Sequence, residues 1–355
     1  MSVECSKCQS YVCKLGRDDS PTENCPMHSD FPSFEELYSE EEQKNAAYQA
    51  ALVEAEGYCE WTRIREIAEY ALKLGVRRVG VAFCSDMIRE AKLAASYLRD
   101  RDLDVFLPPE SPGCDPIAQA EFFHQTQTQI NVVCGMRVDH EALFIAASTS
   151  PVIVLVARDE RLCHNPVSAL YTSASYSRTR LFEDGEGPRE SAFKGGDVAT
   201  LTDVSREFGA ELSPGLNRIQ ETKRFARVLG AKRIGISYCV GFRQEARLLA
   251  GVLVGNGFEV SSVCCKTGAV PKAKVGISDE EKVRPGEDEM ICNPLAQAEL
   301  LNRDEVHLTL ILGQCVGHEA ATLGSLKMPA FCIVAKDRVL GHNSVAALYQ
   351  LEGAS

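Results

Sequence analysis

An internal repeat constrains the fold of this chain more than any other feature of its sequence. The segment Arg63–Glu66 recurs as Arg218–Glu221, and Cys84 recurs as Cys239, both at an offset of 155 residues. The motifs that recur at an offset of 178 residues are Cys114–Glu121 as Cys292–Glu299 and Asp159–Tyr171 as Asp337–Tyr349. Such agreement in order and spacing is typical of a duplicated structural unit. The chain therefore contains two copies of one domain.

The difference between the two offsets gives the second copy 23 extra residues, within the Gly-, Lys- and Glu-rich stretch Lys266–Met290. A chain of 355 residues has room for two or three domains of about 100–200 residues each. The predicted parts are a cysteine-rich metal or cluster segment (residues 1–30), a helical connector (31–60), the first repeat (61–175), a linker (176–212) and the second repeat (213–355).

Each copy alternates short apolar runs with helical patterns. Continuous Val- and Ile-rich runs between helices indicate strands of a parallel sheet that is covered on both faces. The expected strands are 78–84, 104–108, 130–135 and 152–157 in the first copy, and 233–239, 259–264, 308–313 and 330–335 in the second. The predicted fold class is therefore α/β: two tandem, homologous Rossmann-like open parallel-sheet domains, preceded by a small cysteine-rich metal-binding segment.

Composition excludes several classes of function. The net charge of −12 at pH 7 opposes binding to a nucleic-acid backbone or to an anionic membrane surface. No apolar run approaches the roughly 18 residues of a membrane span, and Met1–Cys13 lacks the apolar core of a secretory signal. We therefore expect a cytoplasmic protein, with no nucleic-acid and no membrane partner, whose 15 cysteines stay reduced. Metal binding or thiol chemistry then explains so many cysteines.

The first group of candidate metal ligands lies near the N-terminus. Cys5, Cys8, Cys13 and Cys25 fall within 21 residues, and Pro26 follows the last of them. Four thiolates brought together by short loops suit a tetrahedral metal ion or a cubane cluster. Zinc sites more often use two Cys-x2-Cys pairs, whereas a Cys-Pro end also occurs in cluster ferredoxins. The spacing favours a [4Fe-4S] cluster, with zinc as the alternative.

A second group of ligands is expected to form only after folding. Cys239 and Cys265 end two strands of the second copy, Cys292 precedes a helix start, and Cys315 follows a third strand. These positions share the carboxyl edge of a parallel sheet, where ligands gather. We therefore predict that Cys239, Cys265, Cys292 and Cys315 hold a second cluster or metal. Cys264 is the alternate to Cys265, because alternation along a strand puts their side chains on opposite sides.

Two histidines belong to loops on the same edge. His318 follows Cys315 by three residues, and His342 lies beyond the last strand. Imidazoles beside a cysteine-rich pocket can act as acids and bases. We therefore take His318 and His342 as candidate catalytic residues.

The first copy retains only part of the predicted site. Cys84 and Cys114 match thiols of the second copy, but Pro109-Glu110 and Arg137 stand where the second copy has cysteines. We therefore expect a degenerate site in the first repeat, which acts as a scaffold or closes over the second site. The seven cysteines outside the two predicted groups are interpreted as remnants or as core.

The cysteine-containing motifs resemble the prokaryotic proteins grouped as domain of unknown function 1847. The segments that carry the resemblance are the start Cys5–Cys13, Cys292–Asn302, Gly313–His318 and Lys336–Asn343. It covers residues 5–25 and most of 218–349, with residues 63–171 as a diverged duplicate. Members of that family typically have one cysteine segment and one α/β domain, so a tandem arrangement departs from their pattern. The resemblance implies a metal-binding protein, common in anaerobic prokaryotes, and no particular reaction.

These observations lead to three competing expectations. The first is an iron–sulfur protein with one or two [4Fe-4S] clusters, which performs redox or cluster-assisted chemistry with a redox partner protein or a small-molecule substrate. The second is a zinc-binding structural protein or a soft-metal carrier without turnover. The third is an interaction module in which zinc fixes the N-terminal segment. The residues alone leave open whether the chain is an enzyme.

Overall fold

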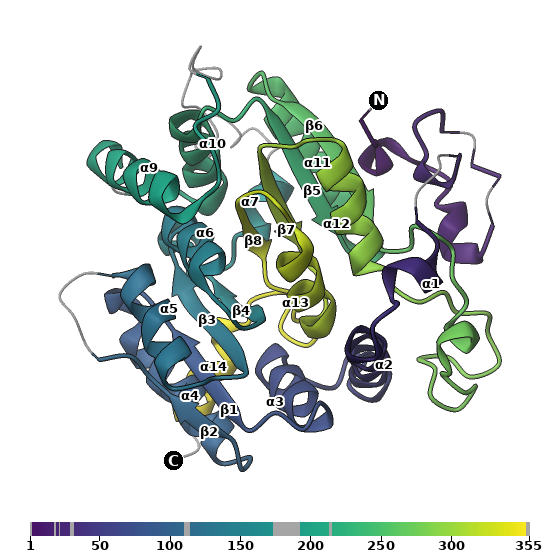
Figure 1. Ribbon diagram of the computed structural model, residues 1–355, viewed down its shortest axis with the longest axis horizontal. Coiled ribbons are helices and arrows are strands. Elements are labelled where there is room, and N and C mark those ends of the chain that lie inside the picture. The colour runs from purple at the N-terminus through teal and green to yellow at the C-terminus, as the bar shows by residue number, and fades with distance from the viewer. Residues whose placement is uncertain are drawn as a thin grey trace.

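Two four-stranded parallel sheets form the framework of the protein (Figure 1). The computed structural model describes residues 2–17, 19–20, 22–28, 32–109, 114–172, 192–212 and 215–352. The first sheet has the strand order β2-β1-β3-β4 and the second has β6-β5-β7-β8. The strands are β1 (Arg78–Ala82), β2 (Asp104–Phe106), β3 (Ile130–Met136), β4 (Val152–Ala157), β5 (Arg233–Tyr238), β6 (Glu259–Cys264), β7 (Leu308–Leu312) and β8 (Ala330–Val334). The predicted α/β class with two Rossmann-like domains is confirmed.

Helices pack around both sheets. The helices are α1 (Phe34–Leu37), α2 (Glu41–Glu56), α3 (Arg63–Lys73), α4 (Ile88–Arg99), α5 (Pro116–Gln125), α6 (Val138–Ala147), α7 (Val167–Thr172), α9 (Val198–Glu211), α10 (Arg218–Leu229), α11 (Arg243–Gly255), α12 (Pro294–Arg303), α13 (Val316–Ser325) and α14 (Val345–Glu352). Each repeat also includes a helix that precedes its first repeated sequence motif, α2 in the first repeat and α9 in the second. Helix α9 lies within the predicted linker, at the position equivalent to α2 in the connector. Among the described residues, no helix is long and apolar enough to cross a bilayer.

The strands are apolar because both faces of each sheet are covered. Every residue of β4 and of β7 is buried, for example.

A glycine forms the turn by which the chain leaves the second sheet after β7. Gly313 follows β7 with a φ of +64°, and a Cβ atom there would lie 2.2 Å from the ring of Phe242. Only glycine fits this close approach and this backbone conformation. The turn leads directly to Cys315 at the carboxyl edge.

The two repeats interlock through reciprocal contacts. The Arg63 guanidinium, on α3 of the first repeat, lies 3.0 Å from the carboxylate of Glu319, on α13 of the second. At the equivalent positions, Arg218 on α10 lies 2.7 Å from Glu141 on α6 of the first repeat. All four side chains are fully buried. Helix α14 likewise packs on α4, and α7 packs on α11. Each repeat therefore completes the core of the other.

The N-terminal segment docks on β6, at the edge of the second sheet. The backbone N–H of Ser262 donates to the Val3 carbonyl at 2.7 Å, and the Ser262 hydroxyl accepts from the Ser6 N–H at 2.9 Å. The carboxylate of Asp304 accepts from the Val3 N–H at 2.8 Å. These bonds hold the N-terminal cysteines against the second repeat.

The extra residues of the second copy form a wall with helices α1 and α2. Tyr38 and Ala51 share one apolar cluster with Val270 and Ile277 of the insertion. The Tyr48 hydroxyl, on α2, donates to Glu281 at 2.6 Å. The insertion follows the carboxyl end of β6 and precedes α12. The insertion and helices α1 and α2 therefore lie at the carboxyl edge of the second sheet.

Candidate metal centres

Five cysteines line one small cavity between the N-terminal segment and the second sheet. Cys5, Cys8, Cys13 and Cys25, the four predicted ligands, come from the N-terminal segment, and Cys264 comes from the end of β6. The structure therefore brings the four predicted residues together. It also adds a fifth thiol, which sequence reasoning had considered only as an alternate ligand of the second site.

Cys264 and Cys265 connect the N-terminal group to the second group. Burial opposes the ionisation of Cys264, but hydrogen bonds from the Cys13 and Cys265 thiols lower its pKa well below the usual range. Cys265, the next residue, contacts Cys239 and Cys292 of the second group. Strand alternation accounts for this division of neighbouring side chains. The two cysteine groups thus adjoin across one peptide bond.

The four cysteines predicted for the second site gather at the carboxyl edge of the second sheet, and all of them are buried. The Sγ atoms of Cys265 and Cys292 lie 3.6 Å apart. Cys265 also hydrogen-bonds to Cys239, which follows β5. Cys315 precedes the first residue of α13 and shares a lysine partner with Cys239.

Positive charges surround the thiols of the second group. Lys336 Nζ lies 3.0 Å from Cys239 Sγ and 3.4 Å from Cys315 Sγ. Arg338 Nη2 lies 3.3 Å from Cys315 Sγ. The Cys265 thiol and the Lys336 ammonium together lower the pKa of Cys239 to about 5. Because a buried ammonium needs a nearby negative charge, this environment favours thiolates over thiols.

Helix α2 supplies an acidic group that sequence reasoning missed. Glu54 Oε1 accepts from Arg338 at 2.8 Å and lies 3.6 Å from Cys315 Sγ. Burial alone would raise the pKa of Glu54, but Arg338 and Lys266 lower it below the usual range. The predicted connector therefore forms part of the second site. The row of buried alanines on α2 is the sequence signal that this helix has an inward face.

His318 contacts the second cysteine group. Its ring is buried on α13 beside Cys292 and Cys315. Burial alone would lower its pKa, but the negative charges of these two cysteines raise it to about 10. A protonated His318 is thus a fourth cation beside the thiolates, with Lys266, Lys336 and Arg338.

His342, the other candidate catalytic residue, has a backbone partner. Its Nδ1 accepts from the N–H of Asp337 at 3.3 Å, and His164 repeats this contact with Asp159 at 3.2 Å in the first repeat. Burial and the charge of Lys336 lower the pKa of His342 to about 4. Because both repeats share the contact, it serves to fix the loop, and a catalytic role for His342 stays a prediction.

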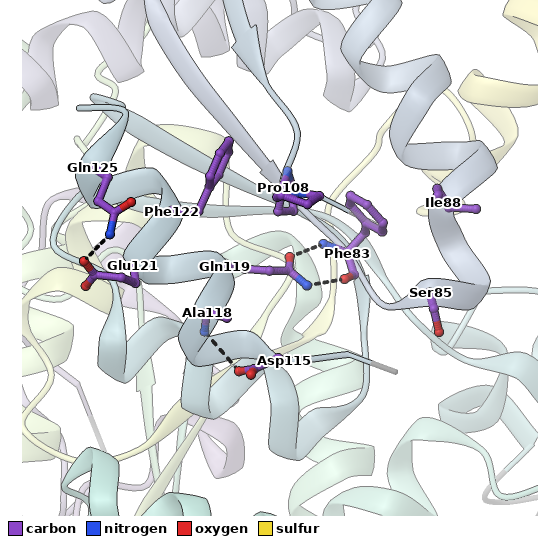
Figure 2. Close-up of a pocket in the computed structure, with 11 residues that line it drawn as sticks. Phe83, Ser85, Ile88, Pro108, Asp115, Ala118, Gln119, Glu121, Phe122 and Gln125 are labelled. Carbon is purple, nitrogen blue, oxygen red and sulfur yellow. Dashed lines mark hydrogen bonds between the residues drawn. The ribbon is translucent and has the colours of Figure 1, made fainter. Parts of the chain in front are cut away.

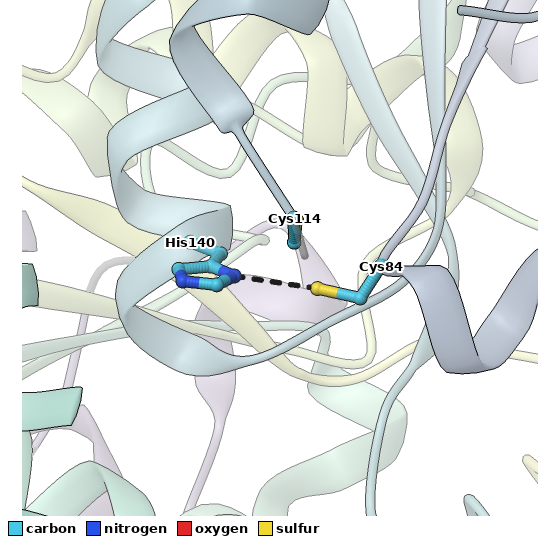
Figure 3. Close-up of side chains that lie close together, drawn as sticks. All are labelled: Cys84, Cys114 and His140. Atoms are coloured by element: carbon cyan, nitrogen blue, oxygen red, sulfur yellow. Dashed lines mark hydrogen bonds between the residues drawn. The ribbon is translucent and has the colours of Figure 1, made fainter. Parts of the chain in front are cut away.

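A smaller group lies at the equivalent edge of the first repeat (Figure 3). The ligand atoms of Cys84, Cys114 and His140 all lie within 4.8 Å of one another, so these residues could hold a metal ion. Cys84 Sγ lies 3.4 Å from His140 Nδ1. Glu110, which stands in place of Cys265, lies outside the described residues. Arg137, in place of Cys315, bonds to Asp139 at 2.6 Å.

A cavity of about 490 Å³ lies beside this group (Figure 2). Phe83 and Phe122 contribute to its apolar lining. The amide of Gln119 accepts from the Phe83 N–H at 3.0 Å and donates to the Phe83 carbonyl at 2.8 Å. Its Nε2 also lies 3.9 Å from Cys114 Sγ. Gln119 thus links the cavity lining to the cysteine pair.

The remaining cysteines have structural or exposed positions. Cys134 on β3 and Cys332 on β8 are fully buried in the sheets. Cys59 and Cys163 are exposed, and both have a positive φ. Of the seven cysteines outside the two predicted groups, two are thus core residues and two are exposed. Cys264 joins the N-terminal group, and Cys84 and Cys114 form the group of the first repeat.

The fold and these sites define a tandem α/β protein whose cysteine groups could hold metal. The chain belongs to the family described as protein of unknown function (DUF1847). The family model matches residues 23–108, 107–155 and 186–332. The match thus includes large parts of both repeats, which confirms the family that the motifs indicated and its tandem occurrence here.

Similar proteins have been found by sequence and by structure. The uncharacterized protein MJ0455 of Methanocaldococcus jannaschii is 37% identical over 149 residues, which are 42% of this chain and 75% of that protein. The crystal structure of Dph2 from Pyrococcus horikoshii with a 4Fe-4S cluster is 13% identical, with 82% of this chain and 91% of that chain covered and a TM-score of 0.24. Aspartate transcarbamoylase from Trypanosoma cruzi is 10% identical, with 82% and 93% covered and a TM-score of 0.21. Structural likeness this low has no bearing on function.

Proposed function

We propose that the protein binds two adjoining iron–sulfur clusters and acts in electron transfer or cluster-assisted chemistry in the cytoplasm of an anaerobic prokaryote. One cluster would be held by Cys5, Cys8, Cys13 and Cys25. The other would be held by Cys239, Cys265, Cys292 and Cys315. The observation that carries the proposal is the pair Cys264 and Cys265, which joins the two thiol groups across one peptide bond. Two clusters so placed would supply one-electron transfer between the groups.

The residues present fit such clusters in chemistry and in charge. Cysteine thiolates are the usual ligands of iron–sulfur clusters. Four thiolates and a cluster carry net negative charge, and the buried Lys336 and the partly buried Arg338 supply positive charge within 3.4 Å of the second group. The four cysteines of the second group are themselves buried, which limits the access of water to their thiols. The residues around the cysteines, as well as the cysteines themselves, therefore suit a negatively charged cluster.

His318 is the side chain best placed to assist chemistry at the second group. It contacts Cys292 and Cys315 and is buried. A protonated imidazole there can stabilise negative charge or deliver a proton to a small-molecule substrate. A redox partner protein would deliver or remove electrons at the N-terminal group, which lies at the edge of the second sheet.

Metal analysis tests the proposal. Protein purified without oxygen is expected to be brown, to absorb near about 400 nm, and to contain about eight iron atoms and eight labile sulfides per chain. Cys8→Ser and Cys265→Ser should each remove about half of the iron, because each variant disrupts one cluster. Iron, sulfide and the electron paramagnetic resonance spectrum after reduction are the measurements.

Cys163→Ser is the matched control, since Cys163 is exposed and outside both groups. It should keep all the iron. A colourless protein with stoichiometric zinc and no iron after anaerobic purification would overturn the proposal. Equal iron content in Cys8→Ser, Cys265→Ser and the control would also contradict the ligand assignment.

A zinc protein is the second candidate, because the distance between two thiols of the second group matches that of two ligands on one zinc ion. The Sγ atoms of Cys265 and Cys292 lie 3.6 Å apart. Two thiolates on one tetrahedral zinc, with Zn–S bonds of about 2.3 Å, would lie about 3.8 Å apart. In that case the second group would store or carry a soft metal without turnover. The same metal analysis distinguishes the two candidates.

A further inference from the structure

We propose that Cys84, Cys114 and His140 of the first repeat bind a single zinc ion. Two thiolates and one imidazole form a ligand set that zinc takes in proteins. Soft sulfur and imidazole donors also select zinc over magnesium or calcium. The site shares no residue with the clusters proposed above, so it stands or fails separately from them.

The fold brings the three ligands to one point on the carboxyl edge of the first sheet (Figure 3). Cys84 follows β1, Cys114 precedes α5, and His140 lies in the first turn of α6. Their ligand atoms lie within 4.8 Å of one another, and no other Cys, His, Asp or Glu atom of the described chain joins this group. Ligands of one tetrahedral zinc lie about 3.3–3.8 Å apart, given bonds of about 2.0–2.3 Å. Small side-chain rotations therefore suffice.

His140 is oriented for metal binding through Nδ1. That nitrogen lies 3.4 Å from Cys84 Sγ, while Nε2 lies 2.9 Å from Arg137 Nη2 and 3.5 Å from Asp139 Oδ2. Zinc on Nδ1 would place the ring proton on Nε2, where Asp139 can accept it. Arg137 Nη2, which here donates to Nε2, would then turn to Asp139 alone. A carboxylate behind the histidine is the usual support of a zinc ligand.

The substitution of Arg137 for a cysteine explains why this site would hold one ion. Arg137 stands where the second repeat has Cys315, and Glu110, outside the described residues, stands where it has Cys265. Two thiols and His140 are therefore the three candidate ligands among the described residues. Three ligands leave one position of a tetrahedral zinc for water or for a substrate atom, as in catalytic zinc sites. The Arg137 guanidinium also adds positive charge beside the two thiolates. The first repeat would thus take a metal different from that of the second.

Zinc uptake by the whole protein tests this site. Anaerobically purified protein is incubated with zinc, passed through a column with a competing chelator, and analysed for zinc and iron by mass spectrometry. The wild type should retain one zinc per chain in addition to its iron. Cys114→Ser and His140→Ala should lose this zinc and keep the iron. X-ray absorption at the zinc edge should show two sulfur ligands and one nitrogen ligand from the protein.

Cys163→Ser, an exposed cysteine of the same repeat, is the control and should keep the zinc. His140→Gln, which preserves most of the side-chain volume, tests the site should His140→Ala fail to fold. The proposal is overturned by a wild type that retains no zinc, by zinc retained in both ligand variants, or by a zinc edge with four sulfur ligands. A protein with this zinc but no iron would contradict the clusters and support the zinc site.

Discussion

Arg63→Met is expected to lower the free energy of unfolding by about 3–5 kcal/mol, because a buried ion pair that loses one partner leaves the other charge uncompensated. Glu319 would remain fully buried without its guanidinium. Arg63 also donates to the carbonyl oxygens of Val154, Gln314 and Lys336, which would lose a donor. Urea denaturation followed by circular dichroism measures the loss.

Two further variants make this prediction specific. Arg65→Met removes an exposed partner of Glu69, 3.9 Å away, and should cost no more than about 0.5 kcal/mol. Arg218→Met should match Arg63→Met in size, because Arg218 makes the equivalent contacts with Glu141. A loss in Arg63→Met no larger than that in Arg65→Met would contradict the role of the buried pair.

Lys336→Met is expected to weaken metal binding at the second cysteine group by about 10–100-fold, the effect typical of a lost partner behind the ligands. The thiolates of Cys239 and Cys315 would lose a buried cation that lies 3.0 and 3.4 Å from them. The N-terminal group should be unaffected. Iron release to a strong chelator, followed over time, should therefore show a fast phase of about half the total iron.

Lys336→Arg restores the charge and should recover most of the metal retention. Lys327→Met removes an exposed lysine and should release iron at the wild-type rate. If Lys336→Met retained iron as long as Lys327→Met does, charge compensation by Lys336 would be excluded.

The strands could be predicted because each one is a short, continuous apolar run, a pattern that can be recognised within a few residues of sequence. Strands β4 and β6 begin and end at the predicted residues, since continuous apolar runs between helices mark buried parallel strands. The same reasoning indicated that Cys264 and Cys265 would point to different sides, and the structure gives them different neighbours. Motif spacing also identified the duplication.

The surroundings of the thiols could not be predicted in the same way. Glu54 reaches the second site because α2 packs on α13, and no pattern within α2 specifies that partner. Lys336 lies just beyond β8, and nothing in the sequence around it specifies its contacts with Cys239 and Cys315. Cys264 joins the N-terminal group because that segment docks on β6 through backbone bonds. Such contacts depend on tertiary packing, which leaves no periodic signal.

The reciprocal Arg63–Glu319 and Arg218–Glu141 pairs are the contacts that a two-fold axis generates between identical subunits. In a symmetric dimer of single-repeat chains, any change in one metal site would appear in both. Joining the two halves in one chain removes that restriction. One half can then keep all four thiols while the other keeps only Cys84 and Cys114, and the shared interface stays intact.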